Sequence, residues 1–178
     1  RARVFNDDGQ DVVPGSGERG RLALGDPIPL GYYKDPEKTE ETFPVIGGRR
    51  WSIPGDWATV ETDGSITLLG RGSACINTGG EKVYPEEVEE AIKEHPGVAD
   101  CNVVGLPDER WGQAVAAVVE LNAANGEAID EEALNRYSRT VLAGYKVPKR
   151  ILLVDLIRRG PNGKPDYRWA REVLEGSS

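Results

Sequence analysis

Three parts of this 178-residue sequence stand out as candidates for carrying chemistry. They are residues 55–57 together with 70–73, residues 77–89, and residues 160–165. Asp56 carries an acceptor-only carboxylate with two oxygens, and Arg71 carries a planar, permanently charged guanidinium. Each part also has a purely structural interpretation. Asp56 can cap a turn, Gly79–Gly80 can form a turn before a helix, and Gly163–Lys164 can lie in a surface loop.

The charge of the sequence is unevenly distributed. Residues 136–171 contain ten basic side chains and only two acidic ones, Asp155 and Asp166, so this stretch carries +8. Because the whole chain carries −8, the remainder carries −16. An acidic body argues against wrapping nucleic acid, whereas a local basic field suits small polyanions such as nucleotide phosphates. The alternative is a solvated charged surface, which charge alone favours.

Length and composition narrow the class of protein. A chain of this length with 38% hydrophobic residues fits one ordinary domain or two small ones. No apolar run approaches the ~18 residues of a transmembrane helix, and no signal peptide is visible after Arg1. Cys75 and Cys101 cannot form a disulfide framework, so we expect a reducing, cytoplasmic compartment. His95 is the single histidine, which leaves no histidine cluster for a metal, and it is interpreted as a packed side chain.

The sequence begins at Arg1 and contains no methionine. Because translation starts at methionine, we interpret the chain as a piece of a longer protein. A processed N-terminus on a methionine-poor protein is the alternative interpretation.

The first part of the chain has the texture of a β-rich region. Residues 1–56 are expected to form short strands and loops, including a strand at 21–24. Two further β-rich runs, Trp57–Val60 and Ser65–Leu69, flank Asp63-Gly64. An Asp-Gly pair between such runs is typical of a β-hairpin turn.

After residue 70 the pattern alternates between strands and helices. Pro85 begins a predicted helix with apolar residues at helical spacing, and Pro96-Gly97 ends it. Asp130 and Asp166 are placed to cap two further helices. The predicted strands are 98–104, 113–121 and 150–154. From Ser73 onward the predicted order is βαββαβα, so we expect an α+β fold in which a short β-rich segment precedes a small α+β domain.

In this order and spacing, the three chemistry-bearing parts resemble the C-terminal part of the adenylate-forming superfamily. That superfamily includes acyl-CoA synthetases, luciferases and the adenylation domains of peptide synthetases. Further matches are Gly31–Phe43, Pro107–Gln113 and Tyr145–Lys149. The resemblance covers nearly the whole chain. Within the superfamily, residues 77–83 and 166–169 look like those of actinobacterial fatty-acyl or steroid-side-chain CoA ligases.

The resemblance implies a division of the chain and an activity. Residues 1–72 correspond to the tail of a large N-terminal domain and residues 73–178 to a mobile C-terminal lid domain. The implied enzyme is an AMP-forming acyl-CoA ligase that uses ATP, Mg²⁺ and CoA and activates a carboxylic acid, of fatty or steroid side-chain type. A homo-oligomer is compatible with it. The alternatives are an adenylation domain that loads a carrier protein and a non-catalytic anion-binding module.

The sequence lacks two segments of that superfamily. One is the Ser/Thr/Gly-rich loop that grips phosphate, and the other is the aromatic-Thr-Glu segment that positions Mg²⁺ and adenine. Mg²⁺ and the acyl pocket are therefore assigned to an N-terminal domain outside this sequence. We expect the 178-residue chain alone to be inactive.

The resemblance also implies roles in adenylation. Asp56 would accept hydrogen bonds from the ribose hydroxyls of ATP, and Arg71 would lie beside the ribose and the phosphate. Lys164 would be the catalytic lysine that stabilises charge as pyrophosphate leaves. Gly163 would give its loop room to enter the cleft. The hinge follows the Gly-Arg pair and falls on Ser73, where the superfamily commonly has Asp or Lys.

The remaining implied roles concern CoA. Glycines at 79 and 80 would line the tunnel for the pantetheine arm, because a thiol arm must pass close to backbone, and Trp111 would pack along that arm. Basic residues of the C-terminal segment would meet the CoA phosphates. The candidates for that contact are Lys146, Lys149 and Arg139.

Overall fold

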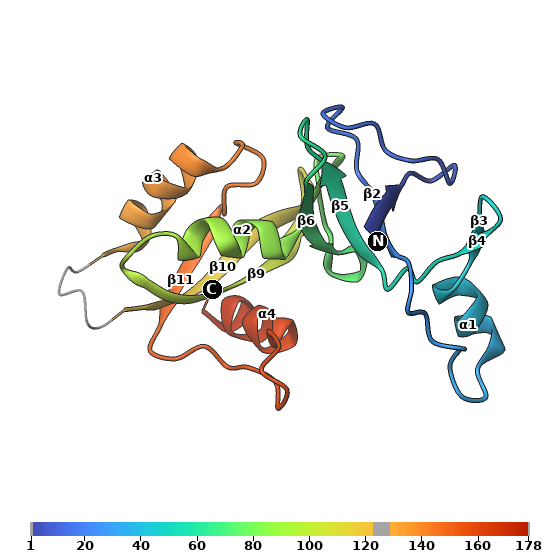
Figure 1. The fold of residues 1–178 in the computed structure, drawn as a ribbon. Coiled ribbons are helices and arrows are strands. Elements are labelled where there is room, and N and C mark those ends of the chain that lie inside the picture. Colours follow the sequence, from blue (N-terminus) through green and yellow to red (C-terminus); the bar gives the residue numbers. More distant parts are fainter. Residues whose placement is uncertain (1, 123–128, 178) are drawn as a thin grey trace. The chain divides into compact units, whose positions relative to one another are not determined.

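The computed structural model describes residues 2–122 and 129–177. The chain divides into two compact units, Arg1–Ser73 (unit 1) and Ala74–Ser178 (unit 2), each with its own apolar clusters (Figure 1). This division falls one residue after the predicted boundary between residues 72 and 73. The assignment of the two parts to an N-terminal domain and a mobile lid stays a prediction.

Unit 1 is built on a four-stranded antiparallel sheet with the order β1–β2–β5–β6. Its strands are β1 (Ala2–Phe5), β2 (Gly20–Leu24), β5 (Asp56–Val60) and β6 (Ile66–Arg71). The β5–β6 hairpin confirms the prediction from Asp63-Gly64. Gly64 adopts φ +83°, and the Asp63 carboxylate accepts hydrogen bonds from the hydroxyl and the N–H of Ser65, which lower the pKa of Asp63.

One helix in unit 1 corrects the expectation of strands and loops alone. Helix α1 (Pro36–Thr42) begins at a proline, and the Asp35 side chain accepts a hydrogen bond from the Lys38 N–H at 3.0 Å. Proline and a capping aspartate are start signals that the sequence offered, but the helix has no buried residue and therefore no apolar periodicity. A small hairpin, β3 (Val45–Ile46) with β4 (Arg49–Arg50), follows it.

Unit 2 is an α+β layer structure around a five-stranded sheet. Its central pair is the long antiparallel hairpin of β9 (Val98–Asp108) and β10 (Gly112–Leu121). Strand β11 (Arg150–Val154) runs parallel to β10, and Thr78 of the β7–β8 hairpin pairs with Gly112 at the other end of β10. Strand β7 spans Ile76–Thr78 and strand β8 spans Glu81–Val83.

The helices of unit 2 cover both faces of this sheet (Figure 1). Helices α2 (Pro85–Lys93) and α3 (Glu131–Val141) pack on one face, and α4 (Tyr167–Gly176) packs on the other. Both faces are apolar because successive β10 residues point in opposite directions and are all buried from Val115 to Val119. The sheet therefore carries an apolar core on each face, and the loops at its ends extend from this framework.

Most predicted elements of unit 2 are confirmed, with two corrections. The single strand expected before Pro85 is a hairpin, β7–β8, because positive φ angles at Gly79 and Gly80 reverse the chain. Strand β9 runs to Asp108, beyond the predicted end at residue 104. The Asp130 and Asp166 caps are both present and accept N–H bonds three residues along.

The cysteines and the histidine are packed residues, with one correction. Cys101 is fully buried in β9, whereas Cys75 is half-buried and lies just before β7 rather than in a strand. His95 follows the end of α2 and packs edge-on against Tyr137 of α3, with ring centroids 4.7 Å apart. The interpretation of His95 as a packed side chain is confirmed.

Candidate functional site

The Asp56–Arg71 pair is assembled by strand register in unit 1. The two residues are directly opposed on β5 and β6, and the Arg71 Nε lies 3.3 Å from the Asp56 Oδ1. A glycine flanks them because a Cβ at Gly72 would lie 2.6 Å from the Trp57 indole nitrogen. The register thus places a carboxylate acceptor beside a guanidinium donor on a partly exposed surface.

Ser73, the predicted hinge residue, lies in η1 (Gly72–Ala74), a short 3-10 turn at the boundary of the two units. Its side chain lies outside the described atoms. Short 3-10 turns commonly connect elements, so the backbone is compatible with a hinge. The hinge role itself stays a prediction.

Lys164 lies at an exposed turn between β11 and α4. The Gly160 N–H donates to the Lys164 carbonyl at 2.9 Å, and the Gly163 N–H donates to the Gly160 carbonyl at the same distance. Gly163 has φ +75°, which favours glycine at this position. Among the described residues, no acidic side chain pairs with the Lys164 ammonium. The ammonium is therefore presented to solvent, free to meet an anionic group.

A second constellation forms where the β7–β8 turn meets the β9–β10 turn. The Gly79 N–H donates to the Trp111 carbonyl at 2.9 Å, and the Asn77 N–H donates to the Gln113 side-chain oxygen at 2.8 Å. A cavity of about 330 Å³ opens beside this junction. Its lining combines the predicted Gly79, Trp111 and Lys149 with Thr78, Glu81, Gly144 and Tyr145. We call this cavity the Trp111 pocket.

Close packing explains why a glycine stands at position 79. A Cβ there would lie 2.6 Å from the Trp111 ring, and Gly79 has φ +59°. Gly80 also has positive φ, +89°, but nothing lies within 4 Å of a Cβ placed on it. The structure therefore brings Gly79 against Trp111, while Gly80 serves the turn and is not part of the described lining.

Trp111 is held by hydrogen bonds and flanked by cations. The Asp108 carboxylate accepts the N–H bonds of Trp111 and Arg110, and these bonds lower the pKa of Asp108. The Lys149 Nζ lies 4.8 Å from the Trp111 ring centroid, and the Arg110 guanidinium carbon lies 4.6 Å from it. Trp111 is 38% exposed, so part of its apolar ring remains accessible beside the two cations that lie over it.

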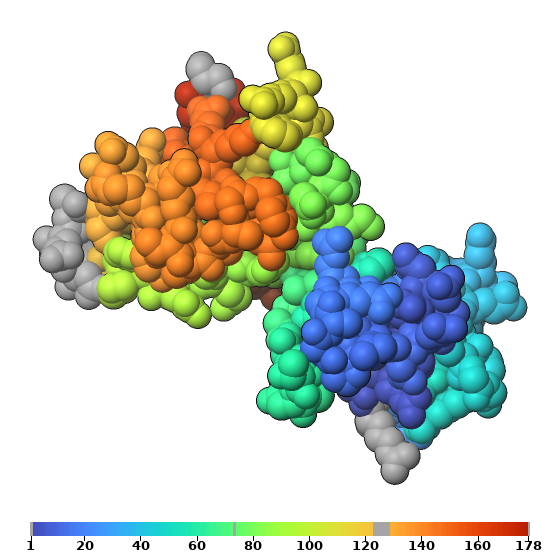
Figure 2. All heavy atoms as spheres, turned by 90° about the horizontal axis from the view of Figure 1, so that it is seen from above, coloured from blue at the N-terminus to red at the C-terminus, as the bar shows by residue number. Residues whose placement is uncertain are grey.

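A larger hollow of about 650 Å³ adjoins the Trp111 pocket through Gly144 and Lys149, which line both. We call it the α3 groove, and its lining includes Arg139 and Arg150. The orange atoms of α3 and of residues 142–150 lie together on this face of unit 2 (Figure 2). Glu131 and Glu132 at the start of α3 also line it, so the α3 groove carries side chains of both charges.

Lys146 is placed differently from the other basic candidates. Its ammonium forms an ion pair with Glu87 of α2 and lies 5.6 Å from the Tyr145 ring centroid. Both partners of the ion pair are largely buried. The Lys146 charge thus joins the 142–149 segment to α2. Lys149 also pairs with an acidic side chain, Asp108, at 3.8 Å, but it lines both hollows, and Arg139 lines the α3 groove.

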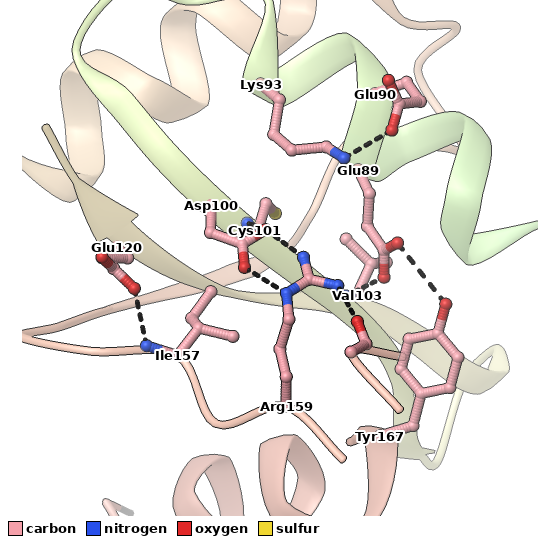
Figure 3. Close-up of polar contacts among 11 residues, drawn as sticks. Glu89, Glu90, Lys93, Asp100, Cys101, Val103, Glu120, Ile157, Arg159 and Tyr167 are labelled. Atoms are coloured by element: carbon pink, nitrogen blue, oxygen red, sulfur yellow. Dashed lines mark hydrogen bonds and ion pairs between the residues drawn. The ribbon is translucent and has the colours of Figure 1, made fainter. Parts of the chain in front are cut away.

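A buried carboxylate, that of Glu89, lies near Arg159 and Tyr167 (Figure 3). Glu89 of α2 accepts a hydrogen bond from the Val103 N–H at 2.9 Å, and the Tyr167 hydroxyl donates to its other oxygen at 3.4 Å. Burial, with a smaller contribution from the negative charge of Glu86, raises the pKa of Glu89 from an ordinary 4.5 to about 7. Burial and the Glu89 charge also raise the pKa of Tyr167.

Sequence reasoning did not single out several of these residues. Glu89 carried a signal, because it lies four residues after Pro85 and three before Ile92, both of which are buried. Tyr145 begins the Tyr145–Lys149 segment that resembles the superfamily, but the resemblance assigns no role to Tyr145 itself. Asp100 and Arg159, whose ion pair is described below, are 59 residues apart, and no local pattern connects them.

The part of the chain that the structure describes contains neither a cluster of metal ligands nor a membrane-spanning helix. No group of three or more His, Cys, Asp or Glu within them could hold a metal ion. None of the helices in residues 2–122 and 129–177 is long and apolar enough to cross a membrane.

Comparison with known families identifies the larger unit. Residues 87–164 match the family model of the AMP-binding enzyme C-terminal domain. Over this range, unit 2 is similar to the AMP-binding enzyme C-terminal domain. The predicted resemblance to the C-terminal portion of adenylate-forming acyl-CoA synthetases is confirmed by this match and by the relatives below.

Curated relatives and solved structures match nearly the whole chain. A medium/long-chain-fatty-acid–CoA/3-oxocholest-4-en-26-oate–CoA ligase of Mycolicibacterium smegmatis is 59% identical over 97% of this chain and 31% of its own length. A 3-oxocholest-4-en-26-oate–CoA ligase of Rhodococcus rhodochrous is 56% identical over 95% of this chain and 30% of its own. The amide bond synthetase McbA of Marinactinospora thermotolerans, 33% identical, superposes with a TM-score of 0.82 over 98% of this chain and 34% of its own. The chain thus spans about a third of the length of these relatives.

Proposed function

We propose that this chain is part of an AMP-forming acyl-CoA ligase whose substrate is a fatty or steroid side-chain carboxylic acid. In the first half-reaction a carboxylate oxygen attacks the α-phosphorus of ATP and pyrophosphate leaves. In the second, the CoA thiol sulfur attacks the acyl carbon, the acyl–phosphate bond breaks and AMP leaves. The names of the two curated relatives support both the reaction and the substrate class.

Unit 1 contributes the Asp56–Arg71 pair to nucleotide binding. Asp56 accepts hydrogen bonds from the ribose hydroxyls, and Arg71 stands beside the ribose and the phosphate. The register that opposes these residues on β5 and β6 supports this role. We assign the acyl pocket and the Mg²⁺ ligands to the portion of sequence that the relatives have in addition.

Lys164 serves the first half-reaction. Its ammonium bridges the acyl carboxylate and the α-phosphate as negative charge accumulates, which is preorganised electrostatic stabilisation. Its exposed position on a closed turn and its lack of a described acidic partner support the role.

The Trp111 pocket serves the second half-reaction. Its lining offers backbone at Gly79 and an apolar ring at Trp111, which suit the pantetheine arm of CoA. Lys149 lies where the pocket meets the α3 groove, and Arg139 lies within the groove. Both cations suit the phosphates at the nucleotide end of CoA. Lys146 supports the pocket indirectly through its ion pair with Glu87.

One observation carries the proposal most directly. The turn that carries Lys164 is anchored on Asp100 near the start of β9, and the Trp111 pocket is anchored on Asp108 at its end. Eight residues of extended strand separate these anchors by ~25 Å. A single reaction centre cannot receive both groups at once, so we propose that unit 2 presents them in turn, with Ser73 at the pivot.

The direct test compares the full-length enzyme, meaning this chain together with the portion its relatives have in addition, with the 178-residue chain. We expect acid-dependent AMP and thioester formation from the first and none from the second. Replacing CoA by a phosphopantetheinylated carrier protein distinguishes the acceptor. Faster acyl transfer to the carrier, or full turnover by the 178-residue chain, would contradict the proposal.

A further inference from the structure

The turn that carries Lys164 is closed at its base. Arg159 and Pro165 pair as an antiparallel bridge, and the Gly160 N–H donates to the Lys164 carbonyl. Gly160 and Gly163 complete the turn through their own hydrogen bond. A turn closed in this way keeps its shape, but its direction depends on what holds its base to the sheet.

The Arg159 guanidinium makes that connection (Figure 3). Its Nε donates to one Asp100 oxygen at 2.7 Å and its Nη2 donates to the other. Its Nη1 donates to the Gly163 carbonyl at 3.2 Å. That carbonyl belongs to the peptide bond that joins Gly163 to Lys164. One planar group therefore fixes the peptide that precedes Lys164 relative to strand β9.

The geometry uses a property that only arginine has. A guanidinium presents its donors in a fixed planar fork, so holding the carboxylate with two of them determines where the third points. The Asp100 side chain is 18% exposed and that of Arg159 is 35% exposed, so water competes only in part for the pair. The Asp100 hydrogen bonds raise the pKa of Arg159, which keeps the guanidinium charged.

The other anchors of this segment do not connect the turn to β9: Arg158 pairs with Asp166 at 3.6 Å across the base of the turn, on the side of α4. The Ile157 N–H donates to the Glu120 carboxylate at 2.8 Å, two residues before Arg159. Tyr167 reaches Glu89 from the start of α4, after the turn has ended. Among the described contacts, the Arg159–Gly163 hydrogen bond is therefore the side-chain contact nearest to Lys164 that connects the turn to β9.

We infer that Arg159 is a positioning residue for adenylation: through Asp100 and the Gly163 carbonyl it holds the Lys164 ammonium in the direction that the first half-reaction needs. The inference rests on the proposed function, because it requires Lys164 to act in that half-reaction. Arg159 itself touches no substrate in this account. It acts by fixing the peptide plane from which Lys164 projects.

The test is Arg159→Lys in the full-length enzyme, with the two half-reactions measured separately. Lysine keeps the charge and one contact to Asp100 but cannot hold the carbonyl with the same fork. We expect pyrophosphate formation to fall by about tenfold to a hundredfold in kcat, as small misplacements of catalytic groups do. Thioester formation from supplied acyl-adenylate should stay within about twofold of the parent.

A double-mutant cycle with Lys164→Ala separates a positioning role of Arg159 from a purely structural one. If Arg159 acts through Lys164, Arg159→Lys lowers pyrophosphate formation in the parent and has no further effect once Lys164 is alanine. Arg168→Gln is the matched charge control, since Arg168 is 90% exposed and pairs only with Glu172 on its own helix among the described contacts. It should leave both half-reactions unchanged.

Distinct outcomes separate the possible failures. Equal losses in both half-reactions, or an equal loss with and without Lys164, would show that Arg159 only stabilises the fold and overturn the inference. Unchanged pyrophosphate formation in Lys164→Ala would overturn the proposed function as well. If Arg159→Lys does not fold, as judged by its thermal unfolding midpoint, Asp100→Asn carries the same test, and absence of a selective adenylation loss there overturns the inference.

Discussion

The two ends of strand β9 hold their candidate groups in opposite ways. At its start, Lys164 projects from an exposed turn. Hydrogen bonds of Arg159 to Asp100 and to the Gly163 carbonyl hold this turn to the sheet, and Glu89 is buried nearby. At its end, the Trp111 pocket is a cavity whose wall is formed in part by the Gly79 backbone packed against the Trp111 ring. A group that must enter another domain's cleft has to be exposed, whereas a channel for a flexible arm has to be enclosed.

Substitutions at the two ends of β9 are therefore expected to impair different half-reactions. Changes near Lys164 act on direction and charge, so they should affect pyrophosphate formation. Changes near Trp111 act on the space available to a ligand, so they should affect thioester formation.

At the Trp111 end of β9, the largest effect is expected from adding a methyl group at position 79. In Gly79→Ala the new Cβ would lie 2.6 Å from the Trp111 ring, so the ring must move into the pocket. We expect the rate of thioester formation to fall by about a hundredfold while pyrophosphate formation is retained. Gly80→Ala is the matched variant, because it also has positive φ but open space around its Cβ. A loss in Gly80→Ala as large as in Gly79→Ala would contradict the steric explanation.

The second expectation concerns stability at the Lys164 end. The pKa of Glu89 is raised to about 7 in the folded chain, so the fold binds a proton that the unfolded chain has released above pH 4.5. The free energy of unfolding should therefore decrease as pH rises from about 4.5 to about 7 and then level off. The side chains that shift the pKa of Glu89 are Glu86, Tyr167 and Lys93, and the Glu89 charge in turn raises the pKa of Cys101 and Arg159.

Glu89→Gln tests this pH dependence. The variant should lose the decrease and be more stable than the parent at pH 8 by up to about 3 kcal/mol, measured by urea unfolding at pH 5 and pH 8. Glu90→Gln is the control on the same helix, since Glu90 is exposed and pairs with Lys93. The same pH slope in parent and Glu89→Gln would assign it to other groups.

A smaller effect is expected from Trp111→Ala. Removing the ring takes away an apolar contact surface flanked by Lys149 and Arg110, so the KM for CoA should rise by about tenfold. The KM for ATP in pyrophosphate formation should not change. Trp111→Phe should restore part of the CoA affinity. If Trp111→Ala changed only the ATP parameters, the pocket would have been assigned to the wrong ligand.

The smallest effect is expected from Lys149→Gln. Lys149 is half exposed, so its attraction to a CoA phosphate is screened, and the KM for CoA should rise about threefold at low salt. The difference between parent and variant should shrink as ionic strength increases. A salt-independent difference would instead indicate that Lys149 acts by packing on Trp111.

The sequence predicted those features that local patterns encode. The caps at Asp130 and Asp166, the Asp63-Gly64 hairpin and the start of α2 at Pro85 are all confirmed. Helix α1 was not predicted, because a helix without a buried face lacks the apolar period that identifies helices. The hairpin at 79–80 was taken for a single strand because its strands have three residues each.

The candidate site divides in the same way. Motif residues such as Gly79, Trp111 and Lys164 were found because they lie within recognisable segments. The Arg159–Asp100 pair was not found, because only the folding of the 155–166 segment onto β9 brings these residues together. Contacts between residues far apart in sequence depend on tertiary packing, which a single sequence does not display.

The most direct test of the separation between the two ends is a single-turnover measurement of both half-reactions in Lys164→Ala of the full-length enzyme. We predict that pyrophosphate formation falls by about a hundredfold to a thousandfold, as when a preorganised electrostatic group is removed. Thioester formation from supplied acyl-adenylate and CoA should remain within about twofold of the parent. An equal loss in both half-reactions, or no loss in pyrophosphate formation, would contradict the account.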